Sequence, residues 1–72
     1  MNQDLLLMIL RDKGPCTVGM IADMFPDVPY SQMKADITGS MTRLERYGLV
    51  KHVGFIKGRR GEAKLWTVDS QM

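Results

Sequence analysis

The chain has very few of the residues from which catalytic and metal sites are built. Its 72 residues include one cysteine, Cys16, and one histidine, His52. A single cysteine excludes an internal disulfide, and a small domain without disulfides is typical of a reducing cytoplasm. The sequence shows no metal-ligand spacing and no glycine-rich phosphate loop. We therefore expect a cytoplasmic protein that is not an enzyme and that needs no metal and no cofactor.

Long hydrophobic runs are also missing. The longest run of aliphatic and methionine residues extends only from Leu5 to Leu10, whereas a membrane span needs about 18 such residues. No membrane partner is expected. With 44% hydrophobic and 25% charged residues, the composition is that of an ordinary folded domain. A chain of this length has room for one domain, so we expect a single domain over residues 1–72.

What the chain does have is positive charge in one stretch. The formal net charge is only +2, but seven of the ten lysines and arginines lie between Arg43 and Lys64. Only Glu45 and Glu62 oppose them there, so this stretch carries +5 and the remainder of the chain carries −3. Clustered positive charge favours binding to a polyanion, because neutralising phosphates releases counterions.

Two helices are predicted in the first third of the chain. Asn2 or Asp4 can cap a helix over residues 5–13, which Gly14 and Pro15 would end. Thr17 can cap a short second helix that runs to residue 24 or 25, where Pro26 blocks continuation. The six apolar residues of the first helix cover all of its sides. That surface is either buried beneath the hairpin or used for self-association in a dimer.

A longer third helix is predicted from Ser31, as its cap, to about Tyr47, with Gly48 in the left-handed terminating position. Its apolar residues recur at spacings of four and three and define one inward stripe: Met33, Ile37, Met41 and Leu44. The opposite face is small, polar and basic, and it comprises Gln32, Ala35, Gly39, Thr42, Arg43 and Arg46, with Asp36 and Ser40 flanking it. A glycine in mid-helix costs about 1 kcal/mol against alanine, and close approach of another surface would explain Gly39.

Two strands are predicted after the third helix. Residues 49–56 and 62–68 are β-branched, aromatic or alternating, and Gly58-Arg59-Arg60-Gly61 between them is typical of a hairpin tip. The alternation changes phase in the first strand, and a bulge at Gly54 would reconcile it. Trp66 is expected to be a core residue rather than a base-stacking platform, and His52 a partly exposed strand residue.

Three helices followed by a basic hairpin resemble the winged helix-turn-helix domain, an α+β fold. The segment Leu44-Glu45-Arg46-Tyr47-Gly48-Leu49-Val50 looks like the end of the recognition helix in small bacterial, archaeal and phage regulators of this family, and residues 61–68 resemble their returning strand. The resemblance covers about residues 4–68.

The resemblance implies that the second and third helices form the helix-turn-helix, that the third enters the major groove of double-stranded DNA, and that the hairpin reaches a minor groove or phosphates. It implies a transcriptional regulator whose candidate DNA contacts are Gln32, Thr42, Arg43 and Arg46 on the third helix and Arg59 and Arg60 on the hairpin, with Lys34, Lys51, Lys57 and Lys64 as weaker phosphate contacts. Ala35 and Gly39 would permit close approach to the groove.

A symmetric DNA site would favour a homodimer, with Leu6, Leu7 and Leu10 of the first helix as the expected contact. The alternative function is a winged-helix interaction module that holds an acidic protein partner without binding DNA. Salt-dependent duplex binding separates the two functions.

Overall fold

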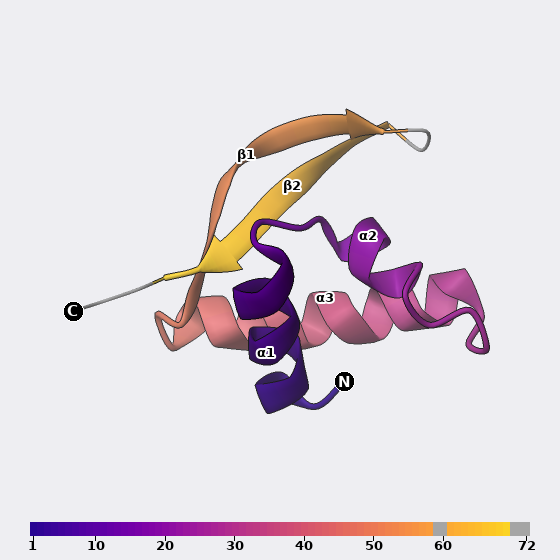
Figure 1. The fold of residues 1–72 in the computed structure, drawn as a ribbon, viewed down its shortest axis with the longest axis horizontal. Coiled ribbons are helices and arrows are strands. Elements are labelled where there is room, and N and C mark those ends of the chain that lie inside the picture. Colours follow the sequence, from indigo (N-terminus) through magenta and orange to yellow (C-terminus); the bar gives the residue numbers. More distant parts are fainter. Residues whose placement is uncertain (59–60, 70–72) are drawn as a thin grey trace.

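The computed structural model describes residues 1–58 and 61–69. Three helices are followed by a two-stranded antiparallel hairpin (Figure 1), and the elements in order are α1 (Gln3–Lys13), α2 (Val18–Ala22), α3 (Tyr30–Arg46), β1 (Val50–Gly58) and β2 (Gly61–Val68). The predicted α+β class and order of elements are confirmed, and the layout is consistent with a winged helix. Within the part of the chain that the structure describes, every helix is too short or too polar to span a bilayer.

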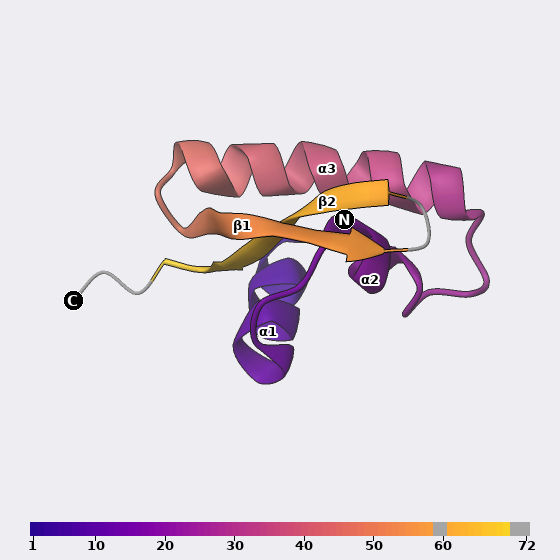
Figure 2. The ribbon, with the colours of Figure 1, turned by 90° about the horizontal axis from the view of Figure 1, so that it is seen from above.

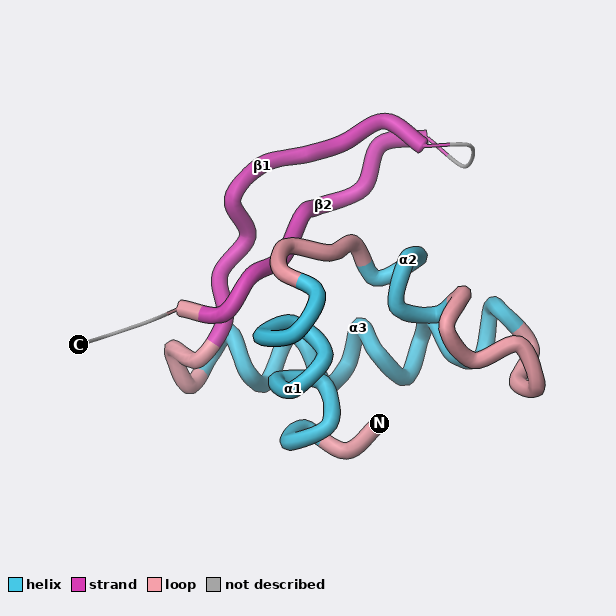
Figure 3. The backbone as a smooth tube through the Cα atoms, in the orientation of Figure 1, coloured by secondary structure: helices cyan, strands magenta, loops and turns pink. Residues whose placement is uncertain are grey.

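The longest element, α3, sets the arrangement of the others. It runs along the long axis of the molecule, and α1 crosses it (Figure 1). The hairpin rises from the C-terminal end of α3 and turns back above α2, so that α2 lies between the hairpin and the first half of α3 (Figure 3). Seen from above, the hairpin follows the direction of α3 (Figure 2). The hairpin and α3 are therefore neighbouring, roughly aligned elements.

The first two helices begin at side-chain caps. Asn2 Oδ1 accepts the N–H of Asp4 at 2.8 Å, and Thr17 Oγ1 accepts the N–H of Met20 at 3.1 Å. Both capping predictions are confirmed, and α1 ends at Gly14 with φ 82°. The second helix is shorter than predicted. The N–H of Asp23 still donates to the carbonyl of Gly19, four residues back, but those of Met24 and Phe25 donate to carbonyls three residues back. This tightens the turn ahead of Pro26, whose ring disfavours helical geometry at the residue before it.

The third helix begins one residue before its predicted cap. Pro29 is in the N-cap position without a side-chain hydrogen bond, and its carbonyl accepts the N–H of Met33 at 3.0 Å. Ser31 lies inside the first turn, so the prediction that it caps the helix is wrong. The end is as predicted: Gly48 has φ 79°, and the N–H of Leu49 donates to the carbonyl of Leu44 at 2.9 Å.

The core lies where the three helices meet the base of the hairpin. Its buried apolar residues are Leu6, Leu10, Cys16, Ile21, Ala22, Met33, Ile37, Met41, Leu44, Val50 and Trp66. The inward stripe predicted for α3 is thus confirmed in full. Ser40, predicted to flank the outward face, is buried instead, and its hydroxyl donates to the carbonyl of Met1 at 2.8 Å. The N-terminal residue covers this side of α3.

The structure decides how the apolar first helix is used. Leu6 and Leu10 are fully buried and Leu7 is partly buried against the core, whereas Leu5 and Met8 are exposed. Leu6 and Leu10 pack inside one protomer and expose almost no surface to a second copy, so of the three residues predicted for a dimer contact Leu7 alone is partly exposed. Two uses were predicted for the apolar surface of this helix, burial and self-association. Most of that surface is buried or partly buried within the domain.

The hairpin contains the predicted bulge. Its register pairs His52 with Trp66 and Gly54 with Leu65, so Val53 has no partner. Gly54 has φ 151°, which L side chains rarely adopt. At its base the hairpin is joined to the segment between α1 and α2: Cys16 and Trp66 exchange two backbone hydrogen bonds of 2.8 Å. Trp66 is 6% exposed, so its prediction as a core residue is confirmed.

Burial of Cys16 predicts a change of stability with pH. Desolvation raises the pKa of its thiol above the ordinary value of 9.0, and Lys13 lowers it by a smaller amount. Because the thiol pKa is higher in the folded state than in the unfolded state, the protonated thiol contributes to folding stability below about pH 9. This contribution is lost as the pH rises through the folded-state pKa. We expect the free energy of unfolding, measured with urea, to fall more steeply above about pH 9 in the wild type than in Cys16→Ala. Equal slopes would contradict this account.

Candidate nucleic-acid interface

The middle of the outward face of α3 consists of small side chains. Ala35, Gly39 and Thr42 are all exposed there. A Cβ atom built at Gly39 would have no atom within 4 Å, so packing within the protein does not explain this glycine. The hydroxyls of Thr38 and Thr42 donate to carbonyls one turn back, at 2.7 and 2.9 Å. A flat surface can therefore approach the backbone of α3 closely.

Cations lie at the C-terminal end of this face. Arg43 and Arg46 are exposed in the last turn of α3, where the helix dipole favours positive charge. Gln32 is exposed near the start of the helix. Among residues 1–58 and 61–69, the ion pair present joins the N-terminal ammonium of Met1 to Asp36. The carboxylate of Asp36 is thereby compensated, and neither arginine is paired with a described acid.

The hairpin contributes a second group of cations. Lys51, Lys57 and Lys64 are exposed on its two strands, and the Nζ atom of Lys64 lies 5.8 Å from the centre of the Trp66 ring. The predicted tip contacts, Arg59 and Arg60, lie outside the described residues. The described cations of the predicted interface are thus spread over α3 and both strands rather than gathered at one point.

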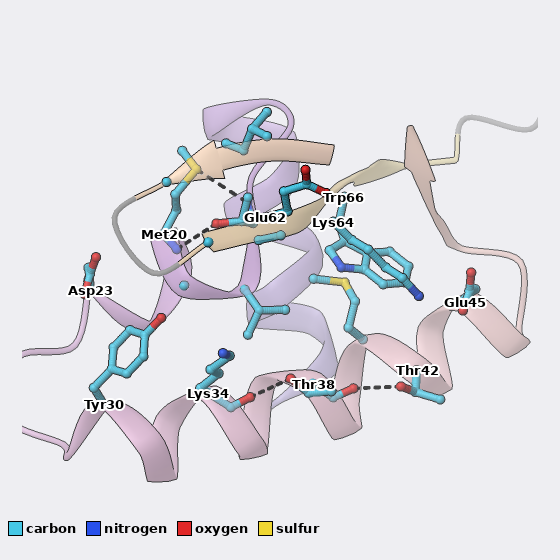
Figure 4. Close-up of a pocket in the computed structure, with 18 residues that line it drawn as sticks. Met20, Asp23, Tyr30, Lys34, Thr38, Thr42, Glu45, Glu62, Lys64 and Trp66 are labelled. Atoms are coloured by element: carbon cyan, nitrogen blue, oxygen red, sulfur yellow. Dashed lines mark hydrogen bonds between the residues drawn. The ribbon is translucent and has the colours of Figure 1, made fainter. Parts of the chain in front are cut away.

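A cleft of about 840 Å³ separates α3 and α2 from the hairpin (Figure 4). Of the predicted contacts, Thr42 and Lys64 line it, whereas Gln32, Arg43, Arg46 and Lys57 do not. The charged residues that line it are of both signs: Lys34, Lys64, Asp23, Glu45 and Glu62. Phosphates would meet carboxylates in this cleft, so its interior is a poor phosphate site. The more favourable phosphate-binding surface is the outward face of α3 and the exposed side of the hairpin.

Sequence reasoning overlooked the stripe of α3 that borders the cleft. Tyr30, Lys34, Thr38 and Thr42 recur every four residues and line one wall together with Glu45. This stripe lies between the buried stripe and the outward face, and only the position of the hairpin distinguishes it from other exposed helix surface. The spacing of four was the available signal. It pointed to a shared side of the helix but could not identify what that side would face.

The described residues contain no group of three or more histidine, cysteine, aspartate or glutamate side chains able to hold a metal ion. The arrangement offers instead an exposed helix face, a basic hairpin and a cleft of mixed charge between them. No protein-family model, no curated protein and no solved structure matches the chain.

Proposed function

We propose that the protein binds double-stranded DNA and acts as a transcriptional regulator, with α3 in the major groove and the hairpin on a minor groove or on phosphates. One observation carries the proposal: the cations of α3 and of the hairpin are exposed, and in residues 1–58 and 61–69 none forms an ion pair with an acid. Exposed, uncompensated cations can neutralise phosphates without first breaking internal contacts.

The residues divide by role. Arg43 and Arg46 are suited to guanine edges or phosphates, because a guanidinium forms paired hydrogen bonds with both. Gln32 is suited to an adenine edge. Lys57 would hold phosphates beside the hairpin, as would Arg59 and Arg60, which lie outside the described residues. Lys64 lines the mixed-charge cleft and is the weaker phosphate contact. The absence of long side chains at Ala35 and Gly39 supports close seating of the helix in the groove.

The first test removes two cations from α3. Arg43→Ala combined with Arg46→Ala is expected to weaken duplex binding about tenfold and to reduce the slope of log affinity against log salt by roughly 2, since each phosphate contact contributes about 0.9. Fluorescence anisotropy of a labelled duplex over a salt series measures both quantities. The matched control is Arg11→Ala with Lys13→Ala, which removes the same charge from the exposed end of α1.

The control should leave affinity and slope nearly unchanged. Equal losses in the two double variants would mean that only net charge matters, which contradicts an interface on α3. Unmeasurable duplex affinity of the wild type at low salt would refute DNA binding altogether. That result would favour the other function, an interaction module that holds an acidic protein partner through the same cations.

Two copies on a symmetric site would increase specificity, because one small module reads few base pairs. Leu6 and Leu10 are buried, so the α1 surface left for a second copy consists mainly of Leu5 and Met8, which are 39% and 62% exposed. Sedimentation velocity with and without the duplex tests this part of the proposal. A monomer under both conditions would remove the dimer and leave DNA binding by one copy.

A further inference from the structure

The bulge in β1 places two aromatic rings on one side of the hairpin. His52 and Phe55 are three residues apart, and in a regular strand such residues point to opposite faces. Because Val53 is skipped in the register, His52 pairs with Trp66 and Phe55 pairs with Lys64. The ring centres of His52 and Phe55 are 6.2 Å apart, and those of His52 and Trp66 are 5.7 Å apart. The three rings therefore form a row, called here the aromatic row.

The aromatic row runs from the core to the surface. Trp66 is 6% exposed and anchors the row in the core, whereas Phe55 is 60% exposed. His52, between them, is exposed as well. Phe55 is absent from the core cluster and from the partly buried residues packed against it. Its ring is consequently available to a partner, and burial within the protein does not account for an aromatic side chain at this position.

Lysines lie beside the exposed end of the row. Lys64 is opposite Phe55 in the register, and Lys57 is two residues further along the same strand, opposite Glu62. Both lysines are exposed. A second copy of the chain would bring like charges together here. A nucleic-acid strand with unpaired bases matches both features, since its bases have flat π faces that stack on aromatic rings and its phosphates pair with lysines.

We propose that Phe55 and His52 stack an unpaired nucleobase, so that the protein binds a duplex with a single-stranded extension more tightly than the blunt duplex. This inference rests on the proposed function and adds a substrate class to it. Trp66 supports the platform from below and remains a core residue. The bulge at Val53 and Gly54 is, on this account, the feature that aligns the stacking surface.

The test compares a blunt labelled duplex with the same duplex carrying an oligothymidine tail at its 3′ or its 5′ end. We expect the wild type to prefer one tailed probe by about 5- to 150-fold, the range that stacking of one base provides. Phe55→Leu should lose this preference without losing affinity for the blunt duplex. Phe55→Trp should keep it, because the interaction requires an aromatic face and not merely an apolar side chain.

Val53→Ala is the matched control, since Val53 is 49% exposed on the same strand but lies outside the row. It should leave the preference intact. Equal binding of blunt and tailed probes by the wild type would overturn the stacking platform and leave duplex binding standing. Binding of the tailed probe and of free oligothymidine, without binding of the blunt duplex, would support the platform and refute the double-stranded function. No binding to any probe would overturn both.

Discussion

Replacing Trp66 by alanine is expected to leave about half or more of the protein unfolded at room temperature. Trp66 is 6% exposed, and it belongs to the core while its backbone joins the hairpin to Cys16. Large-to-small substitution of a buried tryptophan costs about 3–5 kcal/mol. A core of this size supplies only about 3–5 kcal/mol of net stability. The cost therefore matches the whole margin.

Circular dichroism during a urea titration measures this effect. The matched control is Phe55→Ala, an aromatic residue on the same hairpin that is 60% exposed, whose loss should change stability by no more than about 0.5 kcal/mol. Trp66→Phe keeps a large ring in the core and should fold with reduced stability. A Trp66→Ala protein with the wild-type urea midpoint would show that the hairpin is not held by this core contact.

Replacing Gly39 by glutamine is expected to change stability and DNA binding in opposite directions. The Cβ position at Gly39 is open, with no atom within 4 Å, so a longer side chain meets no steric conflict within the protein. Glutamine is a better helix former, and the free energy of unfolding should rise by up to about 1 kcal/mol. If α3 seats closely in the major groove, however, the new side chain holds the helix away from the bases and the flanking phosphates.

We expect duplex affinity of Gly39→Gln to fall by about 100-fold, which corresponds to about 2.8 kcal/mol. Thermal unfolding is the control, because 1 kcal/mol of added stability raises the unfolding midpoint by about 4–8 °C for a domain of this size. A raised midpoint would show that the loss of duplex affinity is not caused by unfolding. Ala35→Gln, on the same face, should lose a similar affinity but gain no stability, because alanine is a better helix former than glutamine. Wild-type affinity in both variants would show that this face of α3 does not approach DNA.

The regular elements were predictable because local sequence specifies them. The stripe of Met33, Ile37, Met41 and Leu44 repeats at helical spacing, and all four are buried. Gly48 could be recognised as a helix end because a left-handed residue is common there. The bulge at Gly54 was predictable from a change of phase in one strand. The errors at Ser31 and at the end of α2 are small shifts that depend on how prolines constrain the connector between α2 and α3.

The candidate interface was predictable only in part. Exposure of Arg43, Arg46 and Gln32 followed from the helical period. Nothing local indicated that Lys34 and Glu45 would share a cleft wall with Thr42, because this depends on where the hairpin turns back. The aromatic row was overlooked for the same reason: His52 and Phe55 become neighbours only after the bulge has shifted the register.

By itself, the sequence determined the α+β class, the order of three helices and a hairpin, and the inward stripe of α3. It also determined that the cations are concentrated between Arg43 and Lys64. These follow from periodicity, capping residues and composition, which act over a few residues. Only the tertiary structure decided that Leu6 and Leu10 face inward while Leu5 and Met8 face solvent, and that Ser40 is buried. Six consecutive apolar residues contain no local asymmetry, so packing against α3 and β2 had to choose between their sides.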